Sequence, residues 1–278
     1  MKPAQSQGCR IISRCRISGD SNLVPVLNLG EQSLTGVFPK NTGTHLSKGP
    51  LELVWCPASG LLQLHHSFDP QEMYGEGYGY RSGLNPSMVE HLQAKARRLE
   101  RQCQLRGGDV VLDIGSSDAT LLKAYQVAGL ERIGMDPSAE KYRSYYSDGI
   151  HLVADFFSKQ AFEKNMATKR PRLITSVAMF YDLEDPVGFA GQVADLLPDG
   201  GVWHFEQSYM PSMLRQNSYD TICHEHLEYY SLQTVLKILE KVGLQVVEVL
   251  MNATNGGSFA VTAVKGNSPI APDRRIID

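Results

Sequence analysis

The feature that most constrains the fold of this chain is the alternation of apolar runs with helical stretches between residues 109 and 265. Each apolar run has the length of a strand, and the runs are DVVLDIG, RIGMD, IHLVADFF, RLITSVAMF and GVWHFEQS. Apolar strands that alternate with helices are typical of a parallel sheet covered on both faces. Two further runs, LQVVEVLM and GSFAVTAVK, flank NATNGG, which is a hairpin signal. The sequence therefore predicts a doubly wound, mostly parallel α/β fold that ends in a hairpin.

The region before this pattern has a different composition. It is rich in Gly, Pro, Ser and Asn and holds short β-like runs such as LVPVLNLG and LELVWC. An amphipathic helix is predicted over 84–105, opened by NPS. Its apolar stripe consists of Met88, Val89, Leu92 and Leu99. We therefore expect a small β-rich N-terminal domain at 1–83, an α/β domain at 84–266 and a tail at 267–278.

Composition and charge argue against several classes of function. The formal net charge is −3, whereas a protein that binds nucleic acid normally carries clustered Lys and Arg. The one basic run, at 94–106, is interpreted as the solvent-facing side of a helix. No apolar stretch is long enough to span a membrane, and residues 1–16 lack the apolar core of a secretion signal. Five cysteines, an odd number, favour a reducing compartment, so we expect a cytoplasmic protein with a small-molecule substrate. The oligomeric state is left open.

In a doubly wound sheet, the ligand binds beyond the carboxyl ends of the strands. The first strand is followed by the turn LDIGSSDATLL, which holds one glycine, Gly115, where a dinucleotide-binding turn has three. Asp118 also stands where a phosphate would have to approach. Three more acids, Asp113, Asp136 and Asp155, end successive strands. A ribose and a cationic group suit these carboxylates, which favours S-adenosylmethionine; the alternative is that each Asp only caps a helix.

LDIGSSDATLL, followed by GMDPS and ADFF, resembles class I S-adenosylmethionine-dependent methyltransferases over residues 88–265. The resemblance implies a seven-stranded, Rossmann-like methyltransferase sheet. It also implies that Asp113 and Gly115 lie near the methionine end of the cofactor, Asp136 on the ribose, and Asp155 and Phe156 beside the adenine. The complete set of expected cofactor-binding residues is Asp113, Gly115, Ser116, Asp136, Pro137, Asp155, Phe156, Met179 and Phe180.

The motifs CRIS, LNLGEQSLTGVF, CPASGLLQLHHSFDP and YGYRSG resemble the N-terminal domain of sugar C-methyltransferases. In that family, two C-x-x-C pairs hold a structural zinc ion. Here the pairs are Cys15 with Ser18 and Cys56 with Ser59, and a neutral hydroxyl is a poor zinc ligand. The spacing of Cys9, His65 and His66 matches no zinc pattern. We therefore expect no structural zinc, and Cys15 and Cys56 to be buried apolar residues.

The family usually continues into another α/β domain of well over a hundred residues, whereas this sequence ends at Asp278. The sequence leaves open whether the chain is a fragment or a short member of the family.

The stretch NSYDTICHEHLEYYSL follows the fifth strand and holds His224, Glu225 and His226. Methylation of carbon needs a base to remove a proton next to a ketone and a donor to stabilise the enolate oxygen. The resemblance implies His226 as the general base, with Glu225 beside it. Cys223 stands where the family has tyrosine.

Several tyrosines are candidates to hold the enolate. Tyr78 and Tyr80 belong to YGYRSG, and Tyr181 follows the fourth strand, where some family members have a histidine; Asp182 is an alternative there. A zinc-protease site needs H-E-x-x-H, which this stretch lacks. A metal-dependent methyltransferase and a polar lid whose histidines only bind the backbone remain alternatives.

The sequence thus predicts an S-adenosylmethionine-dependent methyltransferase that methylates a carbon of a nucleotide-linked keto-sugar through an enolate. The alternatives are O- or N-methylation of another small polar metabolite, or a cofactor-binding protein that has lost catalysis.

Overall fold

The computed structural model describes residues 9–36, 41, 43, 46–74, 78–268, 270 and 272. Most of the tail expected at 267–278 lies outside the described residues.

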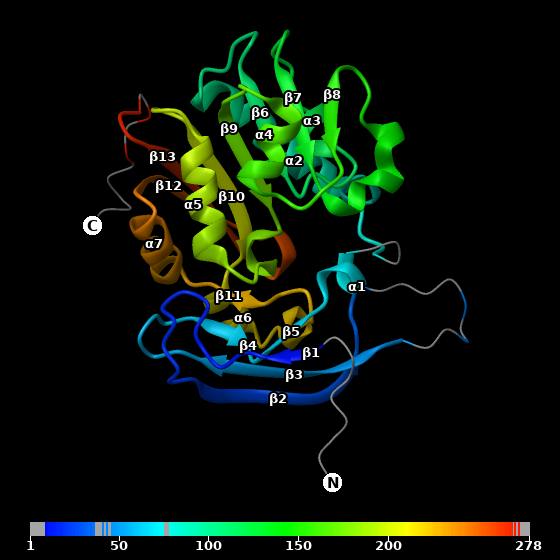
Figure 1. The fold of residues 1–278 in the computed structure, drawn as a ribbon, viewed down its shortest axis with the longest axis vertical. Coiled ribbons are helices and arrows are strands. Elements are labelled where there is room, and N and C mark those ends of the chain that lie inside the picture. The colour runs from blue at the N-terminus through cyan, green and yellow to red at the C-terminus, as the bar shows by residue number, and fades with distance from the viewer. Residues whose placement is uncertain are drawn as a thin grey trace.

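A seven-stranded sheet forms the larger part of the molecule (Figure 1), in the order β12-β13-β10-β9-β6-β7-β8. Its strands are β6 (Val110–Ile114), β7 (Glu131–Met135), β8 (Ile150–Val153), β9 (Pro171–Val177), β10 (Val202–Ser208), β12 (Leu244–Asn252) and β13 (Ser258–Lys265). The β6–β7, β7–β8, β6–β9 and β9–β10 pairs are parallel. β13 runs antiparallel to both β10 and β12, so the predicted hairpin is present. The mostly parallel α/β fold with a small β-rich N-terminal region is confirmed.

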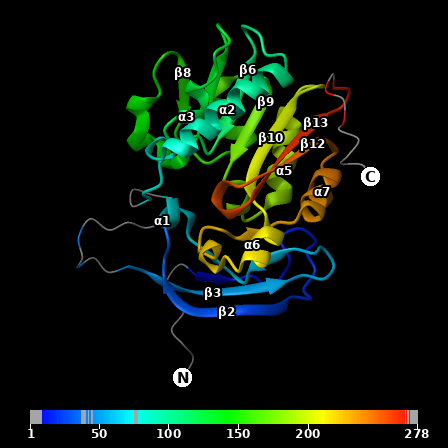
Figure 2. The same ribbon diagram turned by 180° about the vertical axis from the view of Figure 1, so that it is seen from behind.

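Helices cover both faces of this sheet, as the apolar strands require. Figure 1 shows α4 (Lys159–Met166), α5 (Pro186–Leu196) and α7 (Leu232–Lys241) on one face. Figure 2 shows α2 (Pro86–Gln102) and α3 (Thr120–Lys123) on the other. Each face has its own buried apolar cluster, so the sheet is sandwiched between two cores.

The helix predicted over 84–105 is α2, and its ends follow from local chemistry. Asn85 caps it by accepting a hydrogen bond from the Ser87 amide at 3.0 Å, and Pro86 occupies the first turn. Met88, Leu92 and Leu99 are buried against the sheet, as the apolar stripe predicts.

The stretch SDATLLKAYQVAG after the first strand is predicted to be helical, but the helix there, α3, spans only Thr120–Lys123. Ala119, just before it, has a left-handed backbone with φ 61°. Beyond it, the Glu100 carboxylate accepts hydrogen bonds from the amides of Gln126 and Val127, the latter at 2.9 Å. These hydrogen bonds to the Glu100 side chain replace the backbone hydrogen bonds that would continue α3, so the helix ends before them. A 3₁₀ helix, η2 (Pro137–Tyr145), follows the second strand.

A second, four-stranded sheet lies below the first in Figure 1, in the order β11-β4-β3-β2, and we call it the front sheet. Its strands are β2 (Val24–Ser33), β3 (Lys48–Trp55), β4 (Leu62–Leu64) and β11 (Glu228–Tyr229). A two-stranded ribbon of β1 (Cys9–Ile11) and β5 (His66–Phe68) leads into α1 (Pro70–Tyr74). The remaining short helices are η1 (Ser82–Leu84), η3 (Phe180–Asp182), α6 (Met210–Gln216), η4 (Tyr219–Thr221) and η5 (Thr254–Gly256).

One strand of the front sheet comes from far along the chain. β11 pairs with β4, and the Leu64 amide donates to the Leu227 carbonyl at 2.9 Å. Arg16 and Glu228 form a buried ion pair at 3.5 Å beside this strand. The division expected at residue 83 stays a prediction, and the structure adds that residues near 228 complete the front sheet.

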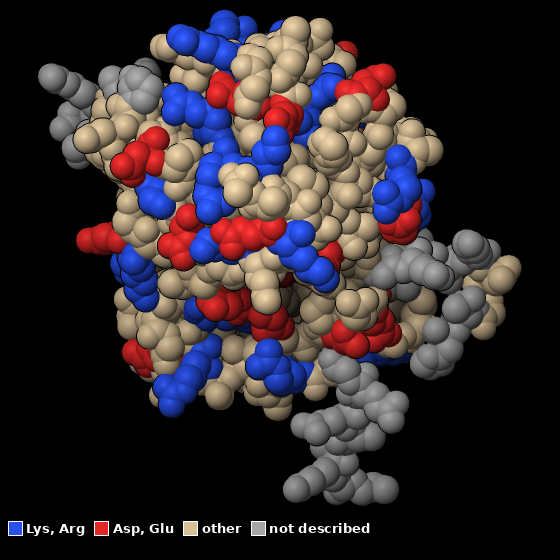
Figure 3. All heavy atoms as spheres, turned by 45° about the horizontal axis from the view of Figure 1, so that its top comes forward, with Lys and Arg blue, Asp and Glu red and all other residues tan. Residues whose placement is uncertain are grey.

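Among the described residues, no helix is both long and apolar enough to cross a membrane. Figure 3 shows Lys and Arg intermixed with Asp and Glu on one face of the molecule, without a broad surface of either sign there.

Candidate active site

A cleft of about 250 Å³ opens where the carboxyl ends of the large sheet meet the front sheet. One wall comes from the turns that follow β6, β7, β8 and β9. The other comes from α1, the segment 78–82 and the segment 224–227. The cleft therefore lies at the sheet edge where a doubly wound fold binds its ligand.

The turn after β6 needs glycine for two reasons. Gly115 has φ +76°, a left-handed conformation that side chains disfavour. A Cβ atom built on it would also lie 3.0 Å from Cγ of Met179, which follows β9. Gly115 and Met179 both line the cleft, as expected. The backbone of this turn thus lies so close to Met179, on the same wall, that a side chain at position 115 would force Met179 to move.

Asp136 ends β7 and lines the cleft. Its two carboxylate oxygens accept hydrogen bonds from the Ser117 amide at 2.8 Å and the Ser138 amide at 2.7 Å. It therefore caps η2 and holds the turn after β6 in place, which matches the capping alternative. A carboxylate has about four lone-pair sites, so capacity for a ligand hydroxyl remains.

Asp113 lies beside the main cleft, in a small adjoining cavity that Gly115 and Ser116 also line. It is buried and accepts a hydrogen bond from the Thr175 hydroxyl at 2.6 Å. Burial raises the pKa of Asp113 to about 7, against the opposing effect of the Thr175 bond. Near neutral pH this carboxyl is thus poised between its two forms and would favour an incoming cation.

Stability is expected to report this raised pKa. Because native Asp113 binds its proton more tightly than the unfolded chain does, the free energy of unfolding should fall as pH rises from about 4 to about 7. Asp113→Asn has no carboxyl to titrate at this position, so its free energy of unfolding should not fall in this way. Relative to the parent, the variant should therefore become more stable by as much as about 4 kcal/mol between pH 4 and pH 7. Urea unfolding at several pH values measures the difference. Parallel pH profiles for the two proteins would contradict it.

Of the other expected cofactor-binding residues, some line the cleft and others lie outside it. Pro137 and Phe156 line the cleft, whereas Asp155 is exposed outside it and accepts a hydrogen bond from the Phe156 amide at 2.8 Å. Phe180 does not line the cleft, contrary to expectation. Its ring is 0% exposed and packs among Phe189, Trp203, Phe205 and Tyr230. The turn of η3 directs this side chain into the core.

Several other residues that line the cleft were not predicted from the sequence. They include Met135, Ser117, Ser138, Phe157, Val177, Ala178, Leu183 and Glu184. The second phenylalanine of ADFF was the clearest signal in the sequence, since Phe157 follows Phe156 directly.

The opposite wall carries most of the candidate catalytic groups, namely Tyr78, Tyr80, His224 and Glu225. Asp182, which follows β9, lines the cleft from the first wall. Burial raises the pKa of Tyr78 far above its usual value, and nearby Asp182 raises it further. Burial also raises the pKa of Asp182 well above its usual range, with Glu225 and Glu228 adding to the effect. The tyrosine is therefore a proton donor at neutral pH, and the Asp182 carboxyl favours its neutral form.

The two histidines of the motif have different surroundings. His224 is buried, and its Nε2 lies 3.1 Å from the Gly49 carbonyl of β3. Its Nδ1 lies 3.4 Å from the Thr35 amide, so both ring nitrogens have partners in the N-terminal region. His224 thus anchors the motif to the front sheet.

His226 is partly exposed and does not line the cleft; its ring lies 4.2 Å from that of Tyr181, which is buried behind the wall. Its Nδ1 lies 2.9 Å from the Thr221 carbonyl and donates to it, which leaves Nε2 as the acceptor nitrogen. Burial lowers the pKa of His226, although the Thr221 bond and Glu225 act in the opposite direction. The imidazole is therefore neutral at pH 7, with one nitrogen able to take a proton.

Glu225 is held by a residue that the sequence analysis did not single out. The Thr35 hydroxyl donates a short hydrogen bond to its carboxylate and accepts one from the His224 amide at 2.9 Å. Next to it, Gly36 leaves room for this carboxylate, because a Cβ atom there would lie 1.9 Å from Glu225 Oε1.

Thr35→Val is expected to lower the free energy of unfolding by about 1–3 kcal/mol, because it leaves the Glu225 carboxylate and the His224 amide without their partner. Urea unfolding monitored by circular dichroism measures this loss. Thr35→Ser keeps the hydroxyl and should restore most of it. Equal stabilities of the Val and Ser variants would contradict the role of the hydroxyl.

The two pairs of C-x-x-S residues meet, although nearly forty residues separate them. Cys15 Sγ lies 3.1 Å from Ser59 Oγ, and Ser18 Oγ lies 3.6 Å from Cys56 Sγ. Both cysteines are buried. The donor set is two thiols and two neutral hydroxyls that bond to one another, which does not fit a structural zinc ion.

Comparison with known proteins gives two family matches. Residues 88–249 match the family model described as "Methyltransferase domain", and residues 15–74 match one described as "Putative zinc binding domain". The C-methyltransferase NovU of Streptomyces niveus is 27% identical over 271 residues. The match covers 96% of this chain and 63% of that protein, so this chain spans less than two thirds of its relative's length.

Solved structures share the fold. One is the methyltransferase chain in a complex with the Trm112 activator from Haloferax volcanii, with TM-score 0.50, 15% identity, and coverage of 66% of this chain and 95% of that one. Another is described as a sarcosine dimethylglycine methyltransferase from Galdieria sulphuraria, with TM-score 0.51, 13% identity, and coverage of 65% and 87%.

Proposed function

The chain belongs to the methyltransferase-domain family matched over residues 88–249, and from this premise we propose that it transfers a methyl group from S-adenosylmethionine to a carbon of a nucleotide-linked keto-sugar. The similarity to a protein named as a C-methyltransferase along 96% of the chain supports carbon as the acceptor. The keto-sugar is inferred from the motifs of the N-terminal region.

The first wall of the cleft suits the methyl donor. Gly115, Met179 and Phe156 offer a close backbone approach and apolar surface, and Asp136 offers carboxylate lone pairs to ribose hydroxyls. Asp113, in the adjoining cavity, would meet the cationic methionine end. The donor supplies an electrophilic methyl group on a sulfonium, and the acidic, glycine-poor turn suits a ligand without phosphates.

The second wall suits activation of the acceptor. His226 does not line the cleft, so its side chain would turn toward the acceptor, where Nε2 would take the proton from the carbon next to the ketone. The electron pair of the broken C–H bond would pass into the enolate. Tyr78 or Tyr80 would donate a hydrogen bond to the enolate oxygen. Glu225, whose charge acts to raise the pKa of His226, would stabilise the imidazolium. The enolate carbon then forms the new bond to the methyl group, which leaves its sulfur.

One observation carries this proposal: a single cleft joins Gly115 and Asp136 on one wall to Tyr78 and Glu225 on the other. Methyl donor and acceptor would therefore face each other in one cleft.

The test is incubation of the protein with a panel of nucleotide-linked keto-sugars in deuterated water, without the methyl donor. Deuterium should enter at the carbon next to the ketone, and addition of the donor should place a methyl group on that carbon. Methylation at oxygen or nitrogen without exchange would favour the alternative acceptor. Binding of the donor without any product across the panel would favour a protein that has lost catalysis.

A further inference from the structure

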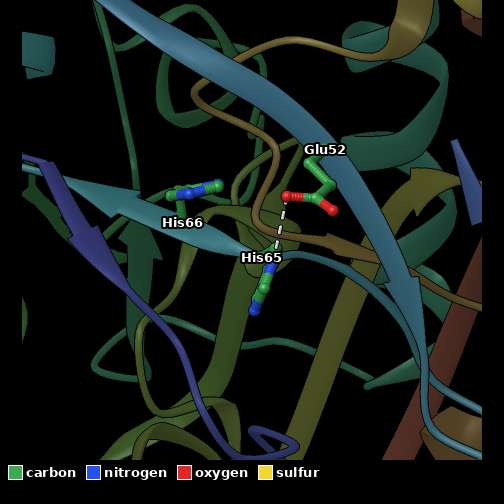
Figure 4. Close-up of side chains that lie close together, drawn as sticks. All are labelled: Glu52, His65 and His66. Atoms are coloured by element: carbon green, nitrogen blue, oxygen red, sulfur yellow. Dashed lines mark hydrogen bonds and ion pairs between the residues drawn. The ribbon is translucent and has the colours of Figure 1, made fainter. Parts of the chain in front are cut away.

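Three metal-ligating side chains meet in the N-terminal region, and none of them lines the cleft. Glu52 belongs to β3, His65 lies at the bend between β4 and β5, and His66 begins β5. One ligand atom from each lies within 4.8 Å of the other two. Figure 4 shows the carboxylate of Glu52 directed at His65, with His66 beside them.

The bend explains how two neighbouring histidines contribute to one cluster. In a regular strand, successive side chains point to opposite faces. Here the His65 amide donates a hydrogen bond to the Glu52 carbonyl at 2.8 Å. The His65 carbonyl accepts one from the Ile12 amide, also at 2.8 Å. The backbone at His65 is thus held on both sides, and the two rings lie 5.2 Å apart, tilted by 57°.

His66 carries an unsatisfied polar atom. The residue is 8% exposed, and its buried Nδ1 has no hydrogen-bond partner among the described residues. Buried polar atoms normally have a hydrogen-bonding or metal partner, so this nitrogen is available to bind one.

The other two side chains are reachable from solvent. The side chain of His65 is 28% exposed and that of Glu52 22%, and the His65 Nδ1 atom lies 3.1 Å from Glu52 Oε2. An ion could therefore enter from this side without unfolding the sheet.

We propose that Glu52, His65 and His66 form a binding site for a divalent transition-metal ion such as Zn²⁺. Two imidazoles and one carboxylate suit such an ion, and a fourth position would be left for water on the exposed side. Zn²⁺ holds its ligand atoms at about 2.0–2.2 Å, so small rotations of the side chains would close the cluster around it.

The position of the site gives the ion a structural consequence. Phe68 follows His66 by two residues on β5, lines the cleft, and packs against His224 with ring centroids 4.7 Å apart. Gly49 of β3, the strand that carries Glu52, is the partner of His224 Nε2. An ion that joins β3 to β5 would therefore stiffen the support of the motif that holds Glu225.

The experiment uses the 278-residue chain, stripped with a chelator and titrated with Co²⁺ and with Zn²⁺. We expect one equivalent to bind, with Co²⁺ giving visible d–d absorption and no thiolate charge-transfer band. Bound Zn²⁺ should raise Tm. Glu52→Gln and His65→Ala, both at partly exposed positions, should each lower the affinity at least tenfold. The matched control is the double variant Cys15→Ser, Cys56→Ser, which should bind like the parent.

Circular dichroism confirms that each variant is folded before titration. Failure of the folded parent to bind either ion would overturn the proposal. So would a thiolate band that disappears in the double cysteine variant, because the ion would then occupy the other cluster. Unchanged affinity in both Glu52→Gln and His65→Ala would overturn it as well.

Discussion

His226→Ala is expected to lower kcat by about 10²–10⁴-fold, which is the usual contribution of a general base. Affinity for S-adenosylmethionine should stay the same, since His226 does not line the wall assigned to the donor. Initial rates with the best keto-sugar, together with calorimetry of the donor, separate the two effects. His151→Ala, at an exposed histidine on β8, is the matched control and should be fully active.

The pH profile gives an independent readout. Because burial lowers the pKa of His226, the parent rate should rise with pH through a pKa below about 6.5 and then stay constant across neutrality. His226→Ala should lose this rise. If His226→Ala keeps near-normal turnover while Glu225→Gln is inactive, the carboxylate that lines the cleft is the base and His226 has no part in the proton transfer.

Gly115→Ala is expected to weaken binding of S-adenosylmethionine at least tenfold, the largest effect on affinity that we expect from a single methyl group. The backbone at Gly115 is left-handed, and the new Cβ would lie 3.0 Å from Met179 Cγ and 3.2 Å from its Cβ. Met179 would have to move, and both residues line the space that the donor would occupy.

Gly149→Ala is the matched control for this prediction. Gly149 has the same φ of +76°, but a Cβ atom there meets nothing within 4 Å. Both variants should lose about 1–2 kcal/mol of stability from the left-handed backbone. Only Gly115→Ala should lose affinity in calorimetry. Equal affinities for the two variants would show that the turn after β6 does not approach the donor.

The class of the large sheet and its terminal hairpin could be predicted because their signals are local. Most of its strands are largely apolar runs, and the NATNGG segment between two strands gives the terminal hairpin. The length of α3 could not be predicted. It depends on Glu100 of α2, whose carboxylate accepts hydrogen bonds from the amides of Gln126 and Val127. A competing bond from a distant side chain leaves no trace in local propensity.

The candidate site divides in the same way. Gly115 and Asp136 could be assigned to the cleft because they follow strands directly, and parallel strands end at one edge. Phe180 could not be placed. At the start of η3, successive side chains point in different directions, so Met179 lines the cleft while the next residue, Phe180, is buried in the core.

The contacts that hold the candidate catalytic motif, residues 224–226, could not be predicted from the sequence either. Thr35 lies 190 residues from Glu225, and Glu52 lies 13 residues from His65, at spacings that match no motif. Only the pairing of β3 with β4, and the approach of the Thr35–Gly36 turn to the 224–226 segment, bring these groups together.

The late origin of β11 has a consequence for how the protein is made. A ribosome synthesises β2, β3 and β4 first, but the partner that covers the free edge of β4 emerges only after residue 229. Until then the nascent chain exposes an open strand edge and the buried faces of Leu62 and Leu64. The front sheet therefore begins before the large sheet in the chain, but it can be completed only after the large sheet's central strands have been translated.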